Sequence, residues 1–426
     1  MKPRQINKSI LFIFIALTFM VSTSCEKANT GKPEQTFVLF SLGYNNLSVA
    51  LKSDIEDLVR YSLSKDHKRN NLLIFSHHTV SPSNYSVKVP PVLTHVYKDK
   101  KDRIIRDTVL VMDSNTIAAS SETIRTVLEY VKENFSADRY GMVISSHGTG
   151  WAPENYCNYP DEFDNVPGDS FWQKRGTERI IPAPLMDGTP DVKSIGVQNI
   201  SRNELIEIDI TDLANDIPMK MDYIIFDACF MGCVEVAYEF KDKCNKMVFS
   251  QTEILADGMD YITMLSYLFN RSTPDLKGLC DNYFKHYDKK SGVNRSATIS
   301  LVDCNQLQPL AQACKDIFES QRSEIAKIDK SEVQEYFRER YIENHGWFYD
   351  LGSIIEHSNA DAELMEAFKN ALNSCIKYKA ATAWFMSETQ IHEHSGLSMY
   401  LPYEDRPYLN NFYKTLKWNQ DTGLIK

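Results

Sequence analysis

The feature that most constrains the fold of this chain is an apolar run that stops at an acid and a thiol. Residues 223–226 are apolar, Asp227 and Cys229 follow, and apolar residues return at helical spacing between residues 233 and 240. This order predicts a buried strand that places Cys229 in the turn before a helix. Amide N–H groups and the helix dipole favour a thiolate there. We therefore expect Cys229 to be a nucleophile, the alternative for a single cysteine being a small buried hydrophobe.

A second apolar run ends in a residue that could serve as the base. Residues 140–146 predict a short strand, and His147 follows directly, with Gly148 and Gly150 close behind it. Glycines allow the backbone to approach a substrate closely. If the two strands are neighbours in an open α/β sheet, the imidazole and the thiol meet at the carboxyl ends of the strands, where such sheets bind ligands. This pairing predicts acyl transfer by a cysteine–histidine pair.

These two motifs resemble those of a known enzyme family. His147-Gly-Thr-Gly-Trp151 and Asp227-Ala-Cys-Phe-Met231 are similar to the histidine and cysteine motifs of the clostripain family of cysteine endopeptidases, which are related to caspases, gingipains and legumain. Residues 36–47, 298–303 and 396–402 resemble three further landmarks of that family. The five segments occur in the family's order, so the resemblance extends from about residue 36 to residue 402.

The resemblance implies a mechanism and a specificity. It implies that Cys229 attacks the peptide carbonyl, that His147 transfers the proton, and that the pair acts as a dyad without an obligatory third residue. Backbone N–H groups of Gly148 and Cys229 are expected to bind the oxyanion. Cleavage after Arg or Lys is implied, with Asp227 and Asp257 as the acids of the substrate pocket. For Asp227 the alternative is a carboxylate that caps the following helix or binds nearby amides.

Alternating strand and helix patterns predict the fold class. They indicate an α/β protein, and the resemblance specifies a caspase-like αβα sandwich with a mostly parallel central sheet. The expected parts are a signal peptide at residues 1–24, a tether at 25–35, a catalytic domain at 36–304 and a C-terminal subdomain at 305–426. That subdomain is expected to be mainly helical, with a late strand pair at residues 380–386 and 396–401.

The amino terminus has the pattern of an export signal. Three basic residues precede an apolar run, residues 10–21, in which Thr18 is the only polar residue. Twelve residues are too few for a helix that spans a bilayer, and the small residues before Cys25 are typical of a bacterial lipoprotein signal. We expect lipidation of Cys25 and a place in the bacterial cell envelope, because multiple acyl chains anchor a protein stably. The alternative is a secreted protein without lipid.

Charge and cysteine content restrict the possible partners. Loss of residues 1–24 changes the formal net charge from −10 to −13, which does not favour nucleic acid as a partner. The expected partners are protein or peptide substrates with Arg or Lys before the cut, and a membrane through the lipid anchor. Eight cysteines follow Cys25, without the spacing of a zinc site or of a close Cys-x-x-Cys pair. We expect mostly buried thiols, no metal and no cofactor.

The long stretch between the two motifs predicts a processing site. Residues 152–195 contain six prolines and few periodic apolar residues. Members of the resembling family are made as zymogens that are cut in this region, so we hypothesise self-cleavage after Lys174, Arg175 or Arg179. The alternative is an insertion that is never cut. The rival to the enzyme as a whole is a catalytically degenerate envelope lipoprotein that acts as a binding module.

Overall fold

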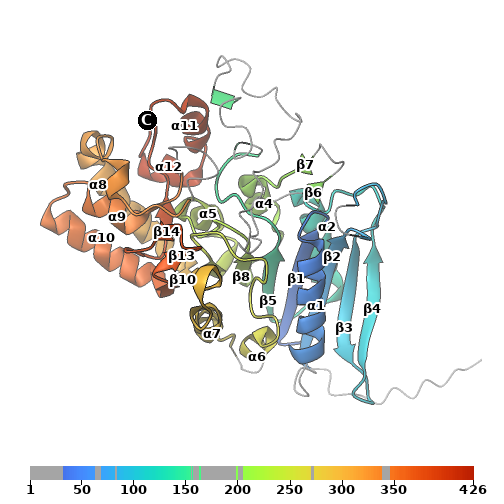
Figure 1. Ribbon diagram of the computed structural model, residues 1–426. Helices are drawn as coiled ribbons and strands as arrows, with labels where there is room; N and C mark the ends of the chain where they lie inside the picture. The colour runs from blue at the N-terminus through green and yellow to red at the C-terminus, as the bar shows by residue number, and fades with distance from the viewer. Residues whose placement is uncertain are drawn as a thin grey trace, which may run out of the picture. The chain divides into compact units, whose positions relative to one another are not determined.

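Nine strands build one central sheet in the computed structural model of the chain. The structure describes residues 32–62, 69–81, 84–154, 156, 163–164, 198–199, 205–269, 273–337 and 346–426. The strand order of the sheet is β12-β10-β9-β8-β5-β1-β2-β3-β4 (Figure 1). Its strands are β1 (Gln35–Gly43), β2 (Asn70–His78), β3 (Val92–Lys98), β4 (Ile104–Val111), β5 (Arg139–Ser145), β8 (Met221–Asp227), β9 (Cys244–Phe249), β10 (Thr298–Asp303) and β12 (Ile376–Ala381).

The centre of the sheet is parallel and its edges are antiparallel. The five adjacent strands β9, β8, β5, β1 and β2 run parallel to one another. Strands β3 and β4 on one side, and β10 and β12 on the other, pair antiparallel. All nine residues of β1 are buried, as expected for a strand whose sheet is covered on both faces. The predicted mostly parallel sheet is thereby confirmed.

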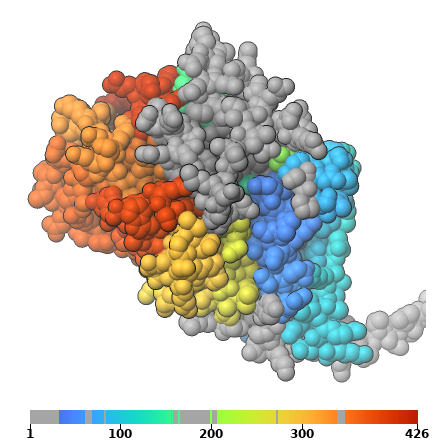
Figure 2. Space-filling view, in the orientation of Figure 1, coloured from blue at the N-terminus to red at the C-terminus, as the bar shows by residue number. Residues whose placement is uncertain are grey.

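Helices cover both faces of the sheet (Figure 1). On one face α1 (Ser48–Ser62) packs on β1 and β2 and contacts α6 (Met264–Leu268), which in turn contacts α7 (Leu276–Asp288). Figure 2 shows α1 in blue and the region of α6 and α7 in yellow on this face. On the other face α2 (Ser121–Asn134) contacts α4 (Ile210–Asp216), and α4 contacts α5 (Val234–Glu239). The predicted αβα sandwich is confirmed.

The C-terminal part of the chain is mainly helical and extends the same sheet. Its helices are α8 (Leu307–Ile325), α9 (Leu351–Glu356), α10 (Ala362–Cys375), α11 (Pro407–Tyr413) and α12 (Lys417–Thr422). The short strands of the described chain are β6 (Gln198–Asn199), β7 (Leu205–Ile206), β11 (Tyr349–Asp350), β13 (Trp384–Phe385), β14 (Thr389–Gln390) and β15 (Ser398–Met399). The domain boundary at residue 305 stays a prediction.

The late strand pair was predicted with the wrong partners. Strand β12 pairs with β10, and β15 pairs with β11, so the two late segments do not pair with each other. Local pattern predicts that a segment is extended, but its partner depends on packing with residues far away in the sequence. In this chain β12 completes the edge of the central sheet, whereas β15 lies beside the cysteine loop, with the Ser398 N–H donating to the Gly232 carbonyl at 2.9 Å.

The cysteines of the described chain are buried thiols. Seven of them, at positions 229, 233, 244, 280, 304, 314 and 375, are free and buried. The Sγ atoms of Cys244 and Cys304 lie 3.4 Å apart. In the part of the chain that the structure describes, no helix has both the length and the apolar character needed to cross a membrane.

Candidate active site

The histidine and the cysteine lie at the ends of two neighbouring strands. Strand β5 pairs with β8 in parallel, and Ser145 is opposite Asp227 in the register. His147 and Cys229 each lie two residues further on, so both reach the same edge of the sheet. A Cβ atom on Gly148 would lie 2.5 Å from the Cys229 carbonyl oxygen and 3.1 Å from its nitrogen. Only glycine therefore allows the two backbones to come this close.

The Cys229 thiol is buried, although the sequence predicts that it lies where sheets of this class bind ligands. Its side chain has 0% exposure, and Sγ lies 3.2 Å from the backbone nitrogen of Ile254, which donates to it. Helix α5 begins only at Val234, with Cys233 as the N-cap residue, so Cys229 precedes the first turn of the helix. The polar group that the structure places at the sulfur is thus the Ile254 N–H in the loop after β9, and not the start of a helix.

The His147 ring is held by an asparagine from a third strand end. Nε2 of His147 lies 2.8 Å from Oδ1 of Asn46, three residues beyond the end of β1. Because an amide oxygen only accepts, this bond fixes the tautomer that carries its proton on Nε2, which leaves Nδ1 as the basic nitrogen. No orienting residue was predicted from the sequence. The available signal was the pair of asparagines at positions 45 and 46, shortly after β1, which is the neighbour of β5.

The residue after the nucleophile has an uncommon backbone conformation. Phe230 has φ of +59°, which non-glycine residues rarely adopt. Its N–H donates to the Thr252 carbonyl at 3.0 Å, and its ring stacks on Phe348 with centroids 4.8 Å apart. Gly150, with φ of +61°, lies against the same Phe348 ring. The C-terminal part of the chain therefore packs directly against both motif loops and helps to hold the cysteine turn.

The two predicted pocket acids lie in different surroundings. Asp227 is fully buried, and its Oδ2 accepts hydrogen bonds from Ser145 at 2.8 Å and Tyr261 at 2.7 Å. Both of these donors are hydroxyl groups, and the roles of Asp227 as a pocket acid or as a helix cap stay predictions. Asp257 has a side chain that is 75% exposed and lies 3.2 Å from Lys290.

Tyr261 separates the two acids. The Tyr261 hydroxyl contacts Asp227, while the residue lines a cavity of ≈ 240 Å³ on the face covered by α1 and α7. Asp257 lines the same cavity, and the remaining carboxylates there are Asp54, Asp57 and Asp260. The structure thus places both predicted acids on the thiol's side of the sheet but does not join them in one cavity.

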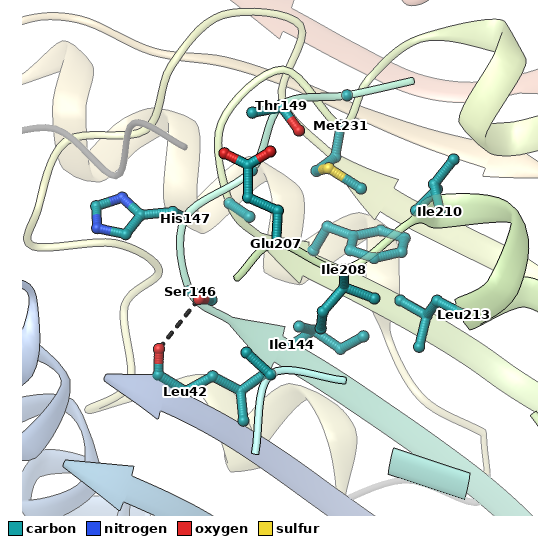
Figure 3. Close-up of a pocket in the computed structure, with 15 residues that line it drawn as sticks. Leu42, Ile144, Ser146, His147, Thr149, Glu207, Ile208, Ile210, Leu213 and Met231 are labelled. Carbon is teal, nitrogen blue, oxygen red and sulfur yellow. Dashed lines mark hydrogen bonds between the residues drawn. The ribbon is translucent and has the colours of Figure 1, made fainter. Parts of the chain in front are cut away.

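A second, smaller cavity lies beside His147. It has a volume of ≈ 50 Å³, and Figure 3 shows aliphatic side chains such as Ile144, Ile208 and Leu213 gathered along it. The His147 ring points away from these side chains, while the Glu207 carboxylate lies near Thr149 (Figure 3). No residue of the short segment 207–213 was predicted to belong to the site, because its apolar pattern does not distinguish a cavity wall from core.

A buried carboxyl group links the helix after the cysteine to the C-terminal part. Oε1 of Glu235 accepts hydrogen bonds from the Tyr400 N–H and the Tyr413 hydroxyl, both at 2.8 Å. Among the described residues its Oε2 has no hydrogen-bond partner. Burial raises the pKa of Glu235 to about 7. The protonated form is therefore the one that this site favours, because an ionised buried carboxylate needs more donors than are present.

We predict that Glu235 makes the protein less stable as the pH rises. A group whose pKa is raised on folding stabilises the folded state below its unfolded pKa, near 4.5, and loses that contribution as the pH rises through about 7. Glu235→Gln, which stays neutral, should therefore gain a few °C in Tm relative to wild type between pH 5 and pH 8. Thermal unfolding across that range measures the difference. A Tm difference that does not change with pH would contradict a neutral Glu235.

Several predicted residues lie outside the described part of the chain. They are the lipidation candidate Cys25 and the processing candidates Lys174, Arg175 and Arg179. Among the described residues there is no group of three or more His, Cys, Asp or Glu side chains that could hold a metal ion.

Comparisons with known proteins identify the family of the chain. The profile of the clostripain family matches residues 40–169 and 184–424. Clostripain of Hathewaya histolytica is 21% identical over 352 residues, an alignment that covers 70% of this chain and 59% of clostripain, so the chain spans about three fifths of that relative.

Two solved structures are similar over nearly their whole length. One is an inactive protease zymogen of this family from Parabacteroides distasonis, and the other is a secreted cysteine protease from Bacteroides thetaiotaomicron named iotapain. Each is 26% identical with a TM-score of 0.71, and each alignment covers 92% of this chain and 99% of the solved chain.

Proposed function

Because this chain belongs to the clostripain family of cysteine peptidases, we propose that it is an endopeptidase with Cys229 as its nucleophile and His147 as its acid and base. The observation that carries the proposal is the placement of both residues at adjacent parallel strand ends, with Gly148 against the Cys229 backbone. The family's catalytic residue types both stand at their motif positions, which favours an enzyme over the binding lipoprotein.

The chemistry is acyl transfer in two steps. The Cys229 sulfur attacks the peptide carbonyl, and His147 protonates the leaving amine, which gives a thioester. The same imidazole then removes a proton from water, and the hydroxide releases the acid and frees the thiol. The N–H groups of Gly148 and Cys229 are the donors that we assign to the tetrahedral oxyanion, since the two backbones approach each other at this point.

The buried thiol corresponds to a closed state of the site. Cys229 has 0% exposure, and its sulfur accepts a hydrogen bond from the Ile254 N–H. A substrate carbonyl therefore reaches the sulfur only after the loop that follows β9 has moved. One similar solved structure is an inactive zymogen. We infer that the uncut chain of this protein is likewise inactive because its thiol is covered, and that activation exposes the thiol.

We assign the specificity for Arg or Lys to the acids on the thiol's side of the sheet. Asp227 is two residues before the nucleophile, and its carboxylate is oriented by the hydroxyl groups of Ser145 and Tyr261. Asp257 lines a cavity together with three further aspartates and one lysine, Lys290, so the balance of charge there is negative and favours a basic side chain. Asp227 is the primary determinant in this proposal, because it is buried and thus interacts more strongly with a cation.

The test of the function is a panel of fluorogenic peptides that differ only in the residue before the cut. We expect the activated wild type to cleave after Arg or Lys, and Asp227→Asn to lose at least about thirtyfold in kcat/KM on those peptides. The cause is the loss of the charge that pairs with the substrate cation, worth about 2 to 5 kcal/mol when buried. In the same variant, the rate at which iodoacetamide alkylates Cys229 should change much less than kcat/KM.

Matched variants separate the effect of the Asp227 charge from the effect of the hydroxyl groups that orient it. Ser145→Ala removes one donor to Asp227 but keeps the carboxylate, so it should preserve the preference for basic residues. If Asp227→Asn still prefers Arg or Lys before the cut, Asp257 is the acid that determines this preference. No turnover of any peptide by activated wild type would favour the binding lipoprotein.

We propose a lipid anchor on Cys25 in the bacterial cell envelope. The basic and apolar pattern before Cys25 supports the proposal. Cys25→Ser should abolish incorporation of labelled fatty acid and release the protein from the membrane fraction or leave its precursor unprocessed. Incorporation that survives the substitution would show that the anchor is elsewhere, and wild-type protein without lipid would identify a secreted protein.

A further inference from the structure

The small cavity beside His147 lies on the opposite face of the sheet from the thiol. Side chains alternate along a strand. Asp227 and Cys229 contact Tyr261 and Ile254 on one side. Their neighbours Phe226 and Ala228 line the cavity on the other side.

Strand β5 shows the same alternation. Ser145 contacts Asp227 on the thiol's side, while Ile144 and Ser146 line the cavity. The two faces meet at the strand ends, where Gly148 lies between the cavity and Cys229.

An extended peptide across this edge must also alternate. Consecutive side chains of an extended chain point to opposite sides. When the scissile carbonyl is at Cys229 and the preceding side chain points to Asp227, the side chain after the cut points to the other face. That residue carries the amine that His147 protonates, so it lies beside the histidine loop. Resting on the proposed peptidase function, we propose that the cavity beside His147 is the subsite for the residue after the scissile bond and accepts a small branched aliphatic side chain.

The walls of the cavity define this preference. They are mainly apolar, and the side chains that form them are Ile144, Ile208, Ile210, Leu213, Phe226 and Met231. The Ser146 hydroxyl donates to the Leu42 carbonyl at 3.0 Å, so it does not offer its proton to a ligand (Figure 3).

Size and charge narrow the choice further. The cavity has ≈ 50 Å³, about a third of the volume of an apolar cavity of about 150 Å³ that binds benzene. Valine, leucine or isoleucine fits this space better than an aromatic ring does. Glu207 borders the cavity near Thr149, and a carboxylate in that position disfavours an acidic side chain (Figure 3). Thr149 and Ile208 are its partly exposed lining residues, which places the entrance on their side.

The experiment varies only the residue after the cut. All the internally quenched peptides share one sequence up to and including an Arg before the scissile bond. They differ only in the residue after that bond, which is Gly, Ala, Val, Leu, Phe or Glu. For activated full-length protein we expect kcat/KM for Val or Leu to exceed that for Gly and Glu by about tenfold or more. Ile208→Ala should reduce the Leu-to-Gly ratio severalfold, and Ile208→Phe, which fills the cavity, should reverse it. Ile104→Ala makes the same change on the outer strand β4 and should keep the wild-type ratio.

An arginyl coumarylamide separates this proposal from the peptidase function. It has no amino acid after the cut, so it reports acyl transfer alone. Turnover of the coumarylamide together with equal rates for all residues after the cut would overturn the subsite and keep the peptidase. A change in selectivity in Ile208→Ala that concerns only the residue before Arg would also overturn the subsite and keep the peptidase. No turnover of the coumarylamide or of any peptide would overturn the peptidase itself.

Discussion

Cys229→Ala is expected to abolish peptide hydrolysis, with kcat/KM falling by about 10⁴-fold or more. The sulfur forms the bond to the substrate, and what remains without a nucleophile is only binding and polarisation of the carbonyl. The fold should persist, because alanine fits the fully buried site and the polar contacts that it removes include only weak sulfur hydrogen bonds with the Ile254 backbone. Steady-state turnover of the arginine peptides measures the loss, and the thermal unfolding midpoint monitors the fold.

Cys233→Ala is the matched control for this prediction. Cys233 is also fully buried, lies four residues further along the same loop, and its pKa is raised by burial, so it is a poor nucleophile. Its replacement should leave turnover close to wild type. If Cys229→Ala retained turnover while Cys233→Ala lost it, the assignment of the nucleophile would be wrong. Alkylation should be slow in the closed state, where Cys229 is covered, and should label Cys229 first after activation.

Substitution of His147 and of Asn46 should lower the activity to different extents. His147→Ala should approach the loss of Cys229→Ala, because in the proposed mechanism the same imidazole serves as acid in one step and as base in the other. Asn46→Ala should lower kcat by about ten- to a hundredfold, a range typical of groups that orient a histidine. Asn46→Asp keeps the acceptor and adds a charge that raises the pKa of His147, so the pH–rate profile should shift upward. An unchanged profile in Asn46→Asp would mean that Asn46 only supports the local structure.

The sequence was sufficient to predict the central strands and the pairing of the motifs. Residues 223–226 and 140–146 became β8 and β5, because long apolar runs bounded by polar loops have few alternatives to a buried parallel strand. Their adjacency follows from the resemblance to a family of known architecture. It could not follow from the two runs alone, since strand order depends on packing across the whole sheet.

The setting of individual side chains could not be predicted in the same way. Whether Asp227 meets solvent, an amide or a hydroxyl depends on Tyr261, 34 positions away. The burial of Cys229 depends on Ile254 in another loop. Each of these contacts is between residues far apart in sequence, and neither leaves a local pattern. Asn46 was within reach of sequence reasoning, because a polar residue at the end of β1 must lie near the ends of its neighbours in a parallel sheet.

The processing hypothesis gains a physical basis from the two ends of the long segment. On the first side Asp164 accepts from the Tyr408 N–H at 2.9 Å and pairs with Arg406 at 3.5 Å, and both its carboxylate and the Arg406 guanidinium are almost fully buried. On the second side the Asn199 N–H donates to the Tyr44 carbonyl at 3.0 Å. Each end is thus attached to a different part of the fold. A cut between Asp164 and Asn199 therefore leaves each fragment attached to the fold through one of these residues, and the fragments also share the sheet through β5 and β8.

Combined replacement of Lys174, Arg175 and Arg179 by alanine is therefore expected to leave the chain in one piece and lower its activity by at least about a hundredfold. A peptidase that cuts after basic residues would lack its own site, and Cys229 would stay covered by the loop that contains Ile254. Wild type should give two fragments that elute together, with a new amino terminus after one of the three residues. Cys229→Ala, which keeps all three basic residues, should also stay intact unless active wild type is added. Amino-terminal sequencing of active protein decides between the two readings, because a full-length chain with full activity would identify the segment as an insertion that is never cut.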